Sequence, residues 1–236
     1  MKTLFCLFCM LFNATIASAV EDTGAATRCH CFQERSFDLQ NKYAADSYLL
    51  TTNFNSFIAA NFHISKSQIV MMKMKGGVEP DDLLIALYVA RACHVKLNVL
   101  LAILDNGGNW QQILESESIL KQGCSKDVFG DHIDIDNKKE VVVGRVTGQL
   151  LKEYYGVLTD DIIALRKKGA SDREIALLFN LERYGGIKRN AAEILEMYRQ
   201  QHMSWGEIAQ SYGLSPEETG KIFLQEGSLQ KPDKSH

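Results

Sequence analysis

A short pattern that recurs at the spacing of a helical pair constrains the fold more than any other feature of this chain. The stretch Ser171–Ala176 (SDREIA) returns 33 residues later as Ser204–Ala209 (SWGEIA), and looser copies begin at Asn109 and Asp81. An apolar segment with helical spacing precedes each copy, so the unit is a helix, a turn and a capped helix. Helical pairs repeated at about 30 to 45 residues usually stack and bury their apolar faces on one another.

These patterns predict an all-α protein of stacked helical hairpins, arranged as an irregular solenoid-like array or a compact orthogonal bundle, with an irregular N-terminal arm. Several predicted helix starts carry a capping box. In this motif the side chain of the N-cap residue accepts from the backbone amide three residues later, and the side chain of that later residue accepts from the N-cap amide. Pro80 and Pro216 are expected to begin two more helices, because proline suits the first helical position. The predicted boxes are Ser171 with Glu174, Ser204 with Glu207, Ser215 with Glu218, Asn109 with Gln112 and Ser65 with Gln68.

Glycines and an aspartate mark further helix boundaries. Asp46 stands where a side-chain N-cap would precede a helix with one apolar face. Glycine adopts the left-handed conformation that ends many helices, which predicts helix ends at Gly77, Gly107, Gly108 and Gly169. The expected face of the helix after Asp46 consists of Leu50, Phe54, Phe57, Ile58 and Asn61.

The first 19 residues have the composition of a signal peptide. Lys2 is basic, Leu4–Phe12 is a short apolar run, and Ala17–Ala19 provides small residues for cleavage. We therefore expect a cut after Ala19 and a secreted or periplasmic, soluble protein. No stretch approaches the roughly 20 apolar residues of a membrane-spanning helix, so no membrane anchor is expected. The formal net charge of −3 gives no electrostatic reason to bind nucleic acid.

After the predicted signal peptide at 1–19, the chain divides by composition into five segments. We predict an irregular cysteine-containing arm at 20–45, a first helical-repeat half at 46–124, a loop at 125–140, a second helical-repeat half at 141–226 and a polar tail at 227–236. A short β-hairpin that includes Val141–Val143 is the alternative to a loop between 125 and 145.

The cysteines outside the signal are Cys29, Cys31, Cys93 and Cys124. An even number of cysteines in an oxidising compartment favours disulfides. A bridge between Cys29 and Cys31 would close a very small, strained ring, so each is expected to pair with Cys93 or Cys124. Two connectivities remain open, and either would hold the N-terminal arm against the helices around Cys93.

Metal binding is the alternative interpretation of the same cysteines. Cys29, His30 and Cys31, together with His94, offer thiolates and imidazoles to zinc or copper. The single residue between the two cysteines differs from the spacing of common zinc sites, which favours disulfides.

Two tryptophans occupy matching positions at the starts of predicted helices. Packing of Trp110 and Trp205 against the preceding helix is the favoured interpretation. The alternative is an aromatic patch that contacts a partner or a sugar.

Residues 204–223 resemble a helix-turn-helix of bacterial DNA-binding domains. A recognition helix should present donors and positive charge to the major groove, whereas this segment presents Glu217 and Glu218. We therefore predict a helical hairpin used for packing, and no nucleic-acid partner.

Through Arg28–Phe32 (RCHCF) and the repeated helix pairs, the mature chain resembles a group of uncharacterised bacterial secreted helical proteins. The resemblance implies export and assigns no activity to any residue. The sequence contains no recognisable nucleophile with its base, no phosphate-binding loop and no complete metal-ligand pattern. We predict a module that binds a protein or peptide, or a structural module, rather than an enzyme; the alternative is a metal-binding or thiol-redox protein that uses the Cys-His-Cys segment.

Overall fold

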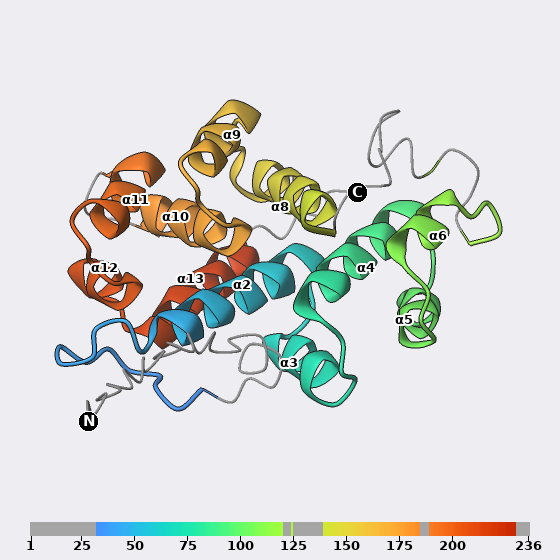
Figure 1. Cartoon of the computed structure of the whole chain (residues 1–236), viewed down its shortest axis with the longest axis horizontal. Coiled ribbons are helices and arrows are strands. Elements are labelled where there is room, and N and C mark those ends of the chain that lie inside the picture. Colours follow the sequence, from blue (N-terminus) through green and yellow to red (C-terminus); the bar gives the residue numbers. More distant parts are fainter. Residues whose placement is uncertain (1–31, 120–123, 125–138, 185–188, 230–236) are drawn as a thin grey trace, which may run out of the picture.

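The computed structural model describes residues 32–119, 124, 139–184 and 189–229, and within these ranges the chain is helical with no strand (Figure 1). The predicted all-α class is confirmed. The helices of the described residues are α2 (Asp46–Phe62), α3 (Lys66–Met74), α4 (Pro80–Cys93), α5 (Leu97–Asp105), α6 (Trp110–Glu115), α8 (Lys139–Tyr155), α9 (Thr159–Lys167), α10 (Asp172–Tyr184), α11 (Ala191–Arg199), α12 (Trp205–Ser211) and α13 (Pro216–Leu229).

Helix α2 forms the centre of the molecule and is covered on all sides. Helix α13 packs along most of its length, while α10, α3 and α12 cover its other faces. The approach of α13 is close because Gly220 has no side chain: a Cβ there would lie 2.7 Å from Ser56 Oγ. The expectation of one buried face is therefore wrong, since Ser47 is the only exposed residue of α2.

Some of the polar side chains buried on α2 are joined to neighbouring helices by hydrogen bonds. Asn180 of α10 donates from Nδ2 to Asn53 Oδ1 at 2.8 Å and to the Thr219 carbonyl at 2.7 Å. The Tyr155 hydroxyl donates to Asn180 Oδ1 at 3.0 Å. A buried polar network of this kind fixes the relative positions of its helices, because an unpaired polar group inside a protein is costly. Asn180 thus connects α2, α8, α10 and α13.

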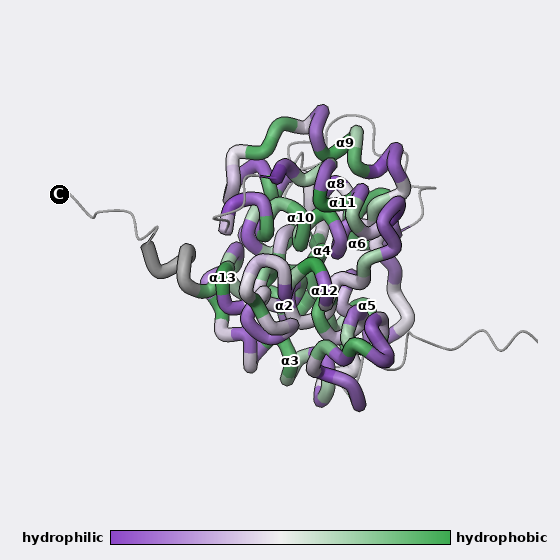
Figure 2. The backbone as a smooth tube through the Cα atoms, turned by 90° about the vertical axis from the view of Figure 1, so that its left-hand side faces the viewer, coloured by the Kyte–Doolittle hydropathy of each residue, from purple (hydrophilic) through white to green (hydrophobic). Residues whose placement is uncertain are grey.

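One hydrophobic core extends through most of the described helices. Figure 2 shows hydrophobic stretches toward the interior and hydrophilic ones around the outside. The contacts of α2 with α13 and α10 cross the boundary predicted at 125–140. Residues 125–138 lie outside the described residues. Val141–Val143 belong to α8, so the hairpin alternative is wrong for these three residues.

All of the predicted capping boxes are present. The box at the start of α12 is representative: Ser204 Oγ accepts from the Glu207 amide at 3.0 Å, and Glu207 Oε2 accepts from the Ser204 amide at 2.8 Å. Pro80 and Pro216 begin α4 and α13 as expected. One further box, at Asn190 and Glu193, was not predicted. The other four confirmed boxes begin α3, α6, α10 and α13.

Replacing Ser204 with alanine should lower the free energy of unfolding by about 1 kcal/mol, because the Glu207 amide loses its acceptor. A denaturant melt measures this change. Ser211→Ala is the control for loss of a serine hydroxyl at the other end of the same helix, where Ser211 Oγ donates to the Ile208 carbonyl. An unchanged midpoint for Ser204→Ala would contradict the capping role.

The predicted glycine turns are confirmed at Gly77, Gly107 and Gly169, whose φ angles are 63°, 84° and 83°. The prediction is wrong for Gly108, which has no positive φ. Gly108 is instead a point of close contact, since a Cβ there would lie 2.5 Å from Ile103 Cγ2.

Helices α12 and α13 form the hairpin that resembles a helix-turn-helix. The face of α13 that carries Thr219, Ile222 and Phe223 is buried, with Phe223 against Phe57 of α2 at 5.4 Å between ring centroids. The packing interpretation of this hairpin is confirmed. Glu217 and Glu218 lie on the exposed side.

Residues 32–45 of the predicted arm are held against the start of α12. A Cβ on Gly206 would lie 2.8 Å from Phe37 Cδ2, so the ring covers the backbone there. Lys42 Nζ and the Tyr43 hydroxyl both donate to the His202 carbonyl, at 2.7 Å and 2.6 Å. The described part of the arm is thus attached through these contacts.

Contrary to the prediction, Asp46 is not the N-cap of α2 and instead accepts a hydrogen bond from the first turn of α12. The N-cap of α2 is Ala45, which makes no side-chain cap, and Asp46 is the first residue of that helix. Asp46 Oδ1 accepts from the Gly206 amide of α12 at 3.1 Å. This contact forms because the tertiary fold places the first-turn amides of α12, a helix far away in sequence, beside the start of α2. Burial raises the pKa of Asp46 from 3.8 to about 6, although the amides of Trp205 and Gly206 oppose the shift.

Because the raised pKa means that the folded state binds a proton more tightly, the protein should gain stability as pH falls from about 6 to 4. The gain is at most about 3 kcal/mol. Asp46→Asn should stabilise the protein at pH 7 and flatten this dependence, as urea melts at several pH values would show. Glu117→Gln, a change at an exposed carboxylate, is the control. An identical pH dependence in wild type and Asp46→Asn would refute the assignment.

Candidate functional site

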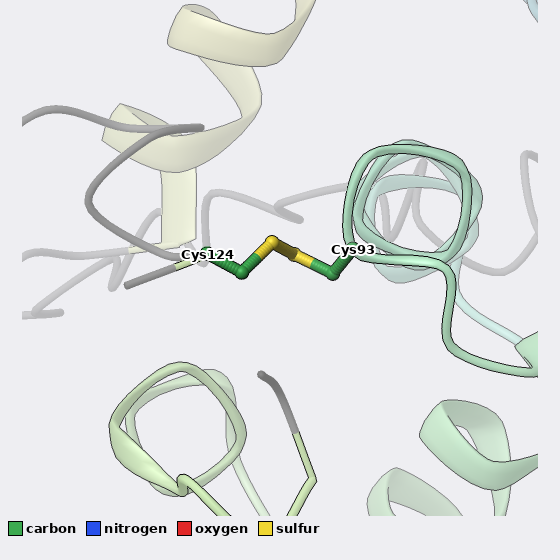
Figure 3. The surroundings of a disulfide bond; sticks show 2 residues. All are labelled: Cys93 and Cys124. Carbon is green, nitrogen blue, oxygen red and sulfur yellow. A yellow bond between two sulfur atoms is a disulfide. The ribbon is translucent and has the colours of Figure 1, made fainter. Parts of the chain in front are cut away.

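The disulfide found in the structure joins Cys93 to Cys124, with 5.7 Å between their Cα atoms (Figure 3). The expected pairing of Cys29 and Cys31 with these two cysteines is therefore wrong. The physical reason is that α5 and α6 fold back along the end of α4, which brings residue 124 next to residue 93. Cys29 and Cys31 lie outside the described residues.

The proposed zinc or copper site gains no support from the described residues. Cys93 is engaged in the disulfide, and His94 is an exposed residue at the left-handed C-terminal end of α4. Within the described ranges no three histidine, cysteine or acidic side chains form a metal-binding group. His30 lies with Cys29 and Cys31 outside these ranges, so metal binding there stays a prediction.

Both tryptophans are packed inside the protein. Trp205 is fully buried and stacks on Tyr198 of the preceding helix α11, with 4.4 Å between ring centroids. Trp110 is buried, and its indole N–H donates to Asp82 Oδ1 at 2.8 Å. Packing against the preceding helix is confirmed for Trp205, whereas Trp110 is buried with its hydrogen bond to α4 rather than α5. The alternative of an exposed aromatic patch is wrong, because both side chains are buried.

The most unusual surface of the described chain is helix α5, which is apolar and yet poorly buried. Of its nine residues (LNVLLAILD), only Leu100 is fully buried. Val99 is 42% exposed, and Ala102 is exposed as well. The reason is position, because α5 packs mainly on α4 and α6 at the edge of the molecule (Figure 1). Four other apolar residues of the helix are half-buried: Leu97, Leu101, Ile103 and Leu104.

Two clefts flank α5. The first, of about 450 Å³, lies between α5 and the turn that joins α3 to α4. The second, of about 700 Å³, is a shallower and more open depression between α5 and the start of α6. Ala102 lines both clefts. The first is lined by Gly76, Gly77, Val78, Glu79, Asp82, Leu101, Ala102, Leu104 and Asp105, and the second by Asn98, Val99, Ala102, Ile103, Asn106, Gly107, Gly108 and Gln112.

Residues 97–115, which contain α5 and α6, form a lobe that is tied to the body of the protein at both ends. We call it the α5 lobe. The Cys93–Cys124 bridge closes a loop of 31 residues around it. Asp82 of α4 attaches the lobe to the body of the protein, because it accepts a hydrogen bond from the indole N–H of Trp110 in α6. Asp82 also forms an ion pair with Lys139 Nζ of α8 at 3.2 Å. The apolar surface of α5 is therefore presented on a fixed support.

The two clefts differ in charge. Three carboxylates, from Glu79, Asp82 and Asp105, line the first, whereas the polar side chains of the second are amides. Asp82 is engaged by Trp110 and Lys139. Acidic side chains thus occur along the first cleft and uncharged ones along the second, with the apolar residues of α5 between them.

Sequence reasoning missed this site because the apolar segment before each capped helix is expected to stack on its neighbours and bury its apolar face. The available signal was the density of aliphatic residues in 97–105, which does not reveal how many neighbours cover the helix.

No family model, curated protein or solved structure matches this chain. Among the described helices, none has the length and apolar character needed to cross a membrane.

Loss of the disulfide should loosen the α5 lobe. For a closed loop of 31 residues, chain entropy predicts that Cys93→Ser/Cys124→Ser loses about 3 to 4 kcal/mol of unfolding free energy. Hydrogen exchange should rise in residues 97–115 more than in α10. Cys29→Ser/Cys31→Ser is the matched control. Disulfide mapping by mass spectrometry that found Cys93 bonded to Cys29 or Cys31 would contradict the pairing.

Proposed function

We propose that this protein is an exported helical scaffold whose α5 lobe binds a segment of another protein. The observation that supports this proposal is an apolar helix with one fully buried residue among nine, flanked by two clefts. Contiguous exposed apolar surface beside a concave site is typical of protein and peptide recognition.

The dimensions of the surface suit a short segment. A helix of nine residues is about 13 Å long, which corresponds to two or three turns of a bound helix. Helix-in-groove complexes use a few apolar anchors at this spacing. Aliphatic side chains, amides and a small number of carboxylates line the clefts, and such groups position a ligand.

Export is part of the same proposal. The basic, apolar and small-residue order of residues 1–19 supports it, as does the Cys93–Cys124 disulfide, because disulfides persist in oxidising compartments. The repeated helical pairs of the second half would then provide the body on which the lobe is mounted.

Site-specific photo-crosslinking tests the proposed function. A photoreactive amino acid at Val99 should produce a defined adduct with another protein in the exported fraction of the native cells. The same residue at Ile163 on α9, which is 40% exposed against 42% for Val99, is a closely matched control and should produce none. Mass spectrometry of the adduct identifies the joined segment. Equal adducts from both positions, or an adduct confined to the same chain, would contradict the proposal.

A further inference from the structure

We propose that the surface of α12 beneath residues 37–43 is a second docking site, which accepts a helix that ends in arginine. The arm closes this site by placing Lys42 where the arginine would lie. The site consists of other elements than the α5 lobe, so the inference goes beyond the proposed function. The observation behind it is that two copies of the internal repeat bind a cation in the same way.

The first copy of the repeat binds an arginine from the helix that follows it. Arg199, the last residue of α11, places Nη2 3.0 Å from the Gly169 carbonyl oxygen and 3.2 Å from Glu174 Oε2. Gly169 is the left-handed residue of the turn before α10, and Glu174 belongs to the capping box of that helix. We call this carbonyl and carboxylate the first niche. A cation at the end of α11 thus attaches this helix to the preceding helical pair.

The second copy of the repeat contains the same niche. His202 and Glu207 stand 33 residues after Gly169 and Glu174. His202 also has a left-handed backbone, with a φ angle of 54°, and Glu207 completes the capping box of α12. We call the His202 carbonyl and the Glu207 carboxylate the second niche.

The cation in the second niche comes from the arm instead of a following helix. Lys42 Nζ lies 2.7 Å from the His202 carbonyl oxygen and 3.5 Å from Glu207 Oε2. The arm therefore takes the place of the first helix of a further repeat. Terminal repeats of helical arrays need such a cover, because an uncovered repeat surface stacks on another.

The arm is attached lightly enough for a helix to displace it. Between residues 33 and 43, every residue except Phe37 and Lys42 is exposed. A partly exposed ion pair such as that of Lys42 with Glu207 contributes little to stability. Arginine also has more donors than lysine, in a planar fork that suits a carboxylate. An arginine from a partner helix is therefore a strong competitor for the second niche.

Two features of the surface beneath the arm suit such a helix. Gly206 permits close approach, since a Cβ there would lie 2.8 Å from Phe37 Cδ2. The Ser204 amide is the main cause that lowers the pKa of Glu207, and Lys42 adds to this shift. The Glu207 carboxylate is therefore ionised at neutral pH with or without the arm.

The α11 segment is the probe for this site, because α11 is the helix that fills the first niche. A labelled peptide of residues 190–200 (NAAEILEMYRQ) is titrated against the oxidised full-length protein by fluorescence anisotropy. The double variant Phe37→Ala/Lys42→Ala should bind it at least about fivefold more tightly than wild type, because the arm no longer competes. A peptide with glutamine in place of the arginine should show no such gain.

Two further variants separate the niche from the rest of the arm. Glu207→Gln keeps a capping box, because glutamine fills this position in the boxes that begin α3 and α6. Added to the double variant, it should reduce the preference for the arginine peptide to less than about twofold. Gln33→Ala/Gln40→Ala, a change at two exposed residues of the arm, is the matched control and should bind as wild type does.

Circular dichroism melts check that each variant is folded. If the double variant does not fold, Lys42→Ala by itself should produce a smaller gain in the same direction. Equal affinity of the arginine peptide for wild type and the folded variant would refute the inference, as would equal binding of the two peptides. A folded variant that binds neither peptide would show that the arm is only a fixed cover. Sedimentation of an oligomer by such a variant would identify a second copy as the occupant and refute the inference as well. None of these outcomes bears on the crosslink from Val99, which tests the α5 lobe.

Discussion

The arrangement of this protein depends on the burial of helix α2, whose polar side chains are enclosed together with its apolar ones. A helix covered on all sides must satisfy its polar groups through the helices around it, since water is excluded. Asn180 of α10 does so for Asn53 Oδ1 and also donates to the Thr219 carbonyl of α13, whereas Thr51 Oγ1 of α2 has no partner in the described structure. This requirement fixes α10 and α13 around α2.

Two lysines of α3 complete the enclosure of α2. Lys73 donates to Asn55 at 3.0 Å, and Lys66 donates to Thr52. Burial lowers the pKa of each lysine from 10.5 to about 8. Both amines thus lose part of their hydration where α3 packs against α2. Their hydrogen bonds constrain the orientation of α3 more closely than apolar packing does.

The same organisation explains why α5 is left exposed. Helices α10 and α13 are grouped around α2, whereas α5 packs mainly on α4 and α6 at the edge of the molecule. Leu100 is the one fully buried residue of α5, and four half-buried aliphatic residues of the helix also pack on the core. The disulfide and the Trp110–Asp82 hydrogen bond supply further anchoring. The result is an apolar surface held in place without being covered.

The sequence by itself determined that the chain is helical and where many of its helices begin. Capping boxes, prolines at helix starts and glycines in left-handed turns act within about four residues, so Ser204 with Glu207 could be assigned without any knowledge of the fold. Only the tertiary structure decided that Cys93 pairs with Cys124, that Asp46 accepts a hydrogen bond from the start of α12 and that α5 rather than a tryptophan forms the candidate surface. Each of these depends on which segments distant along the chain become neighbours. Hydropathy records whether a side chain favours burial, but the packing of the other helices determines whether anything covers it.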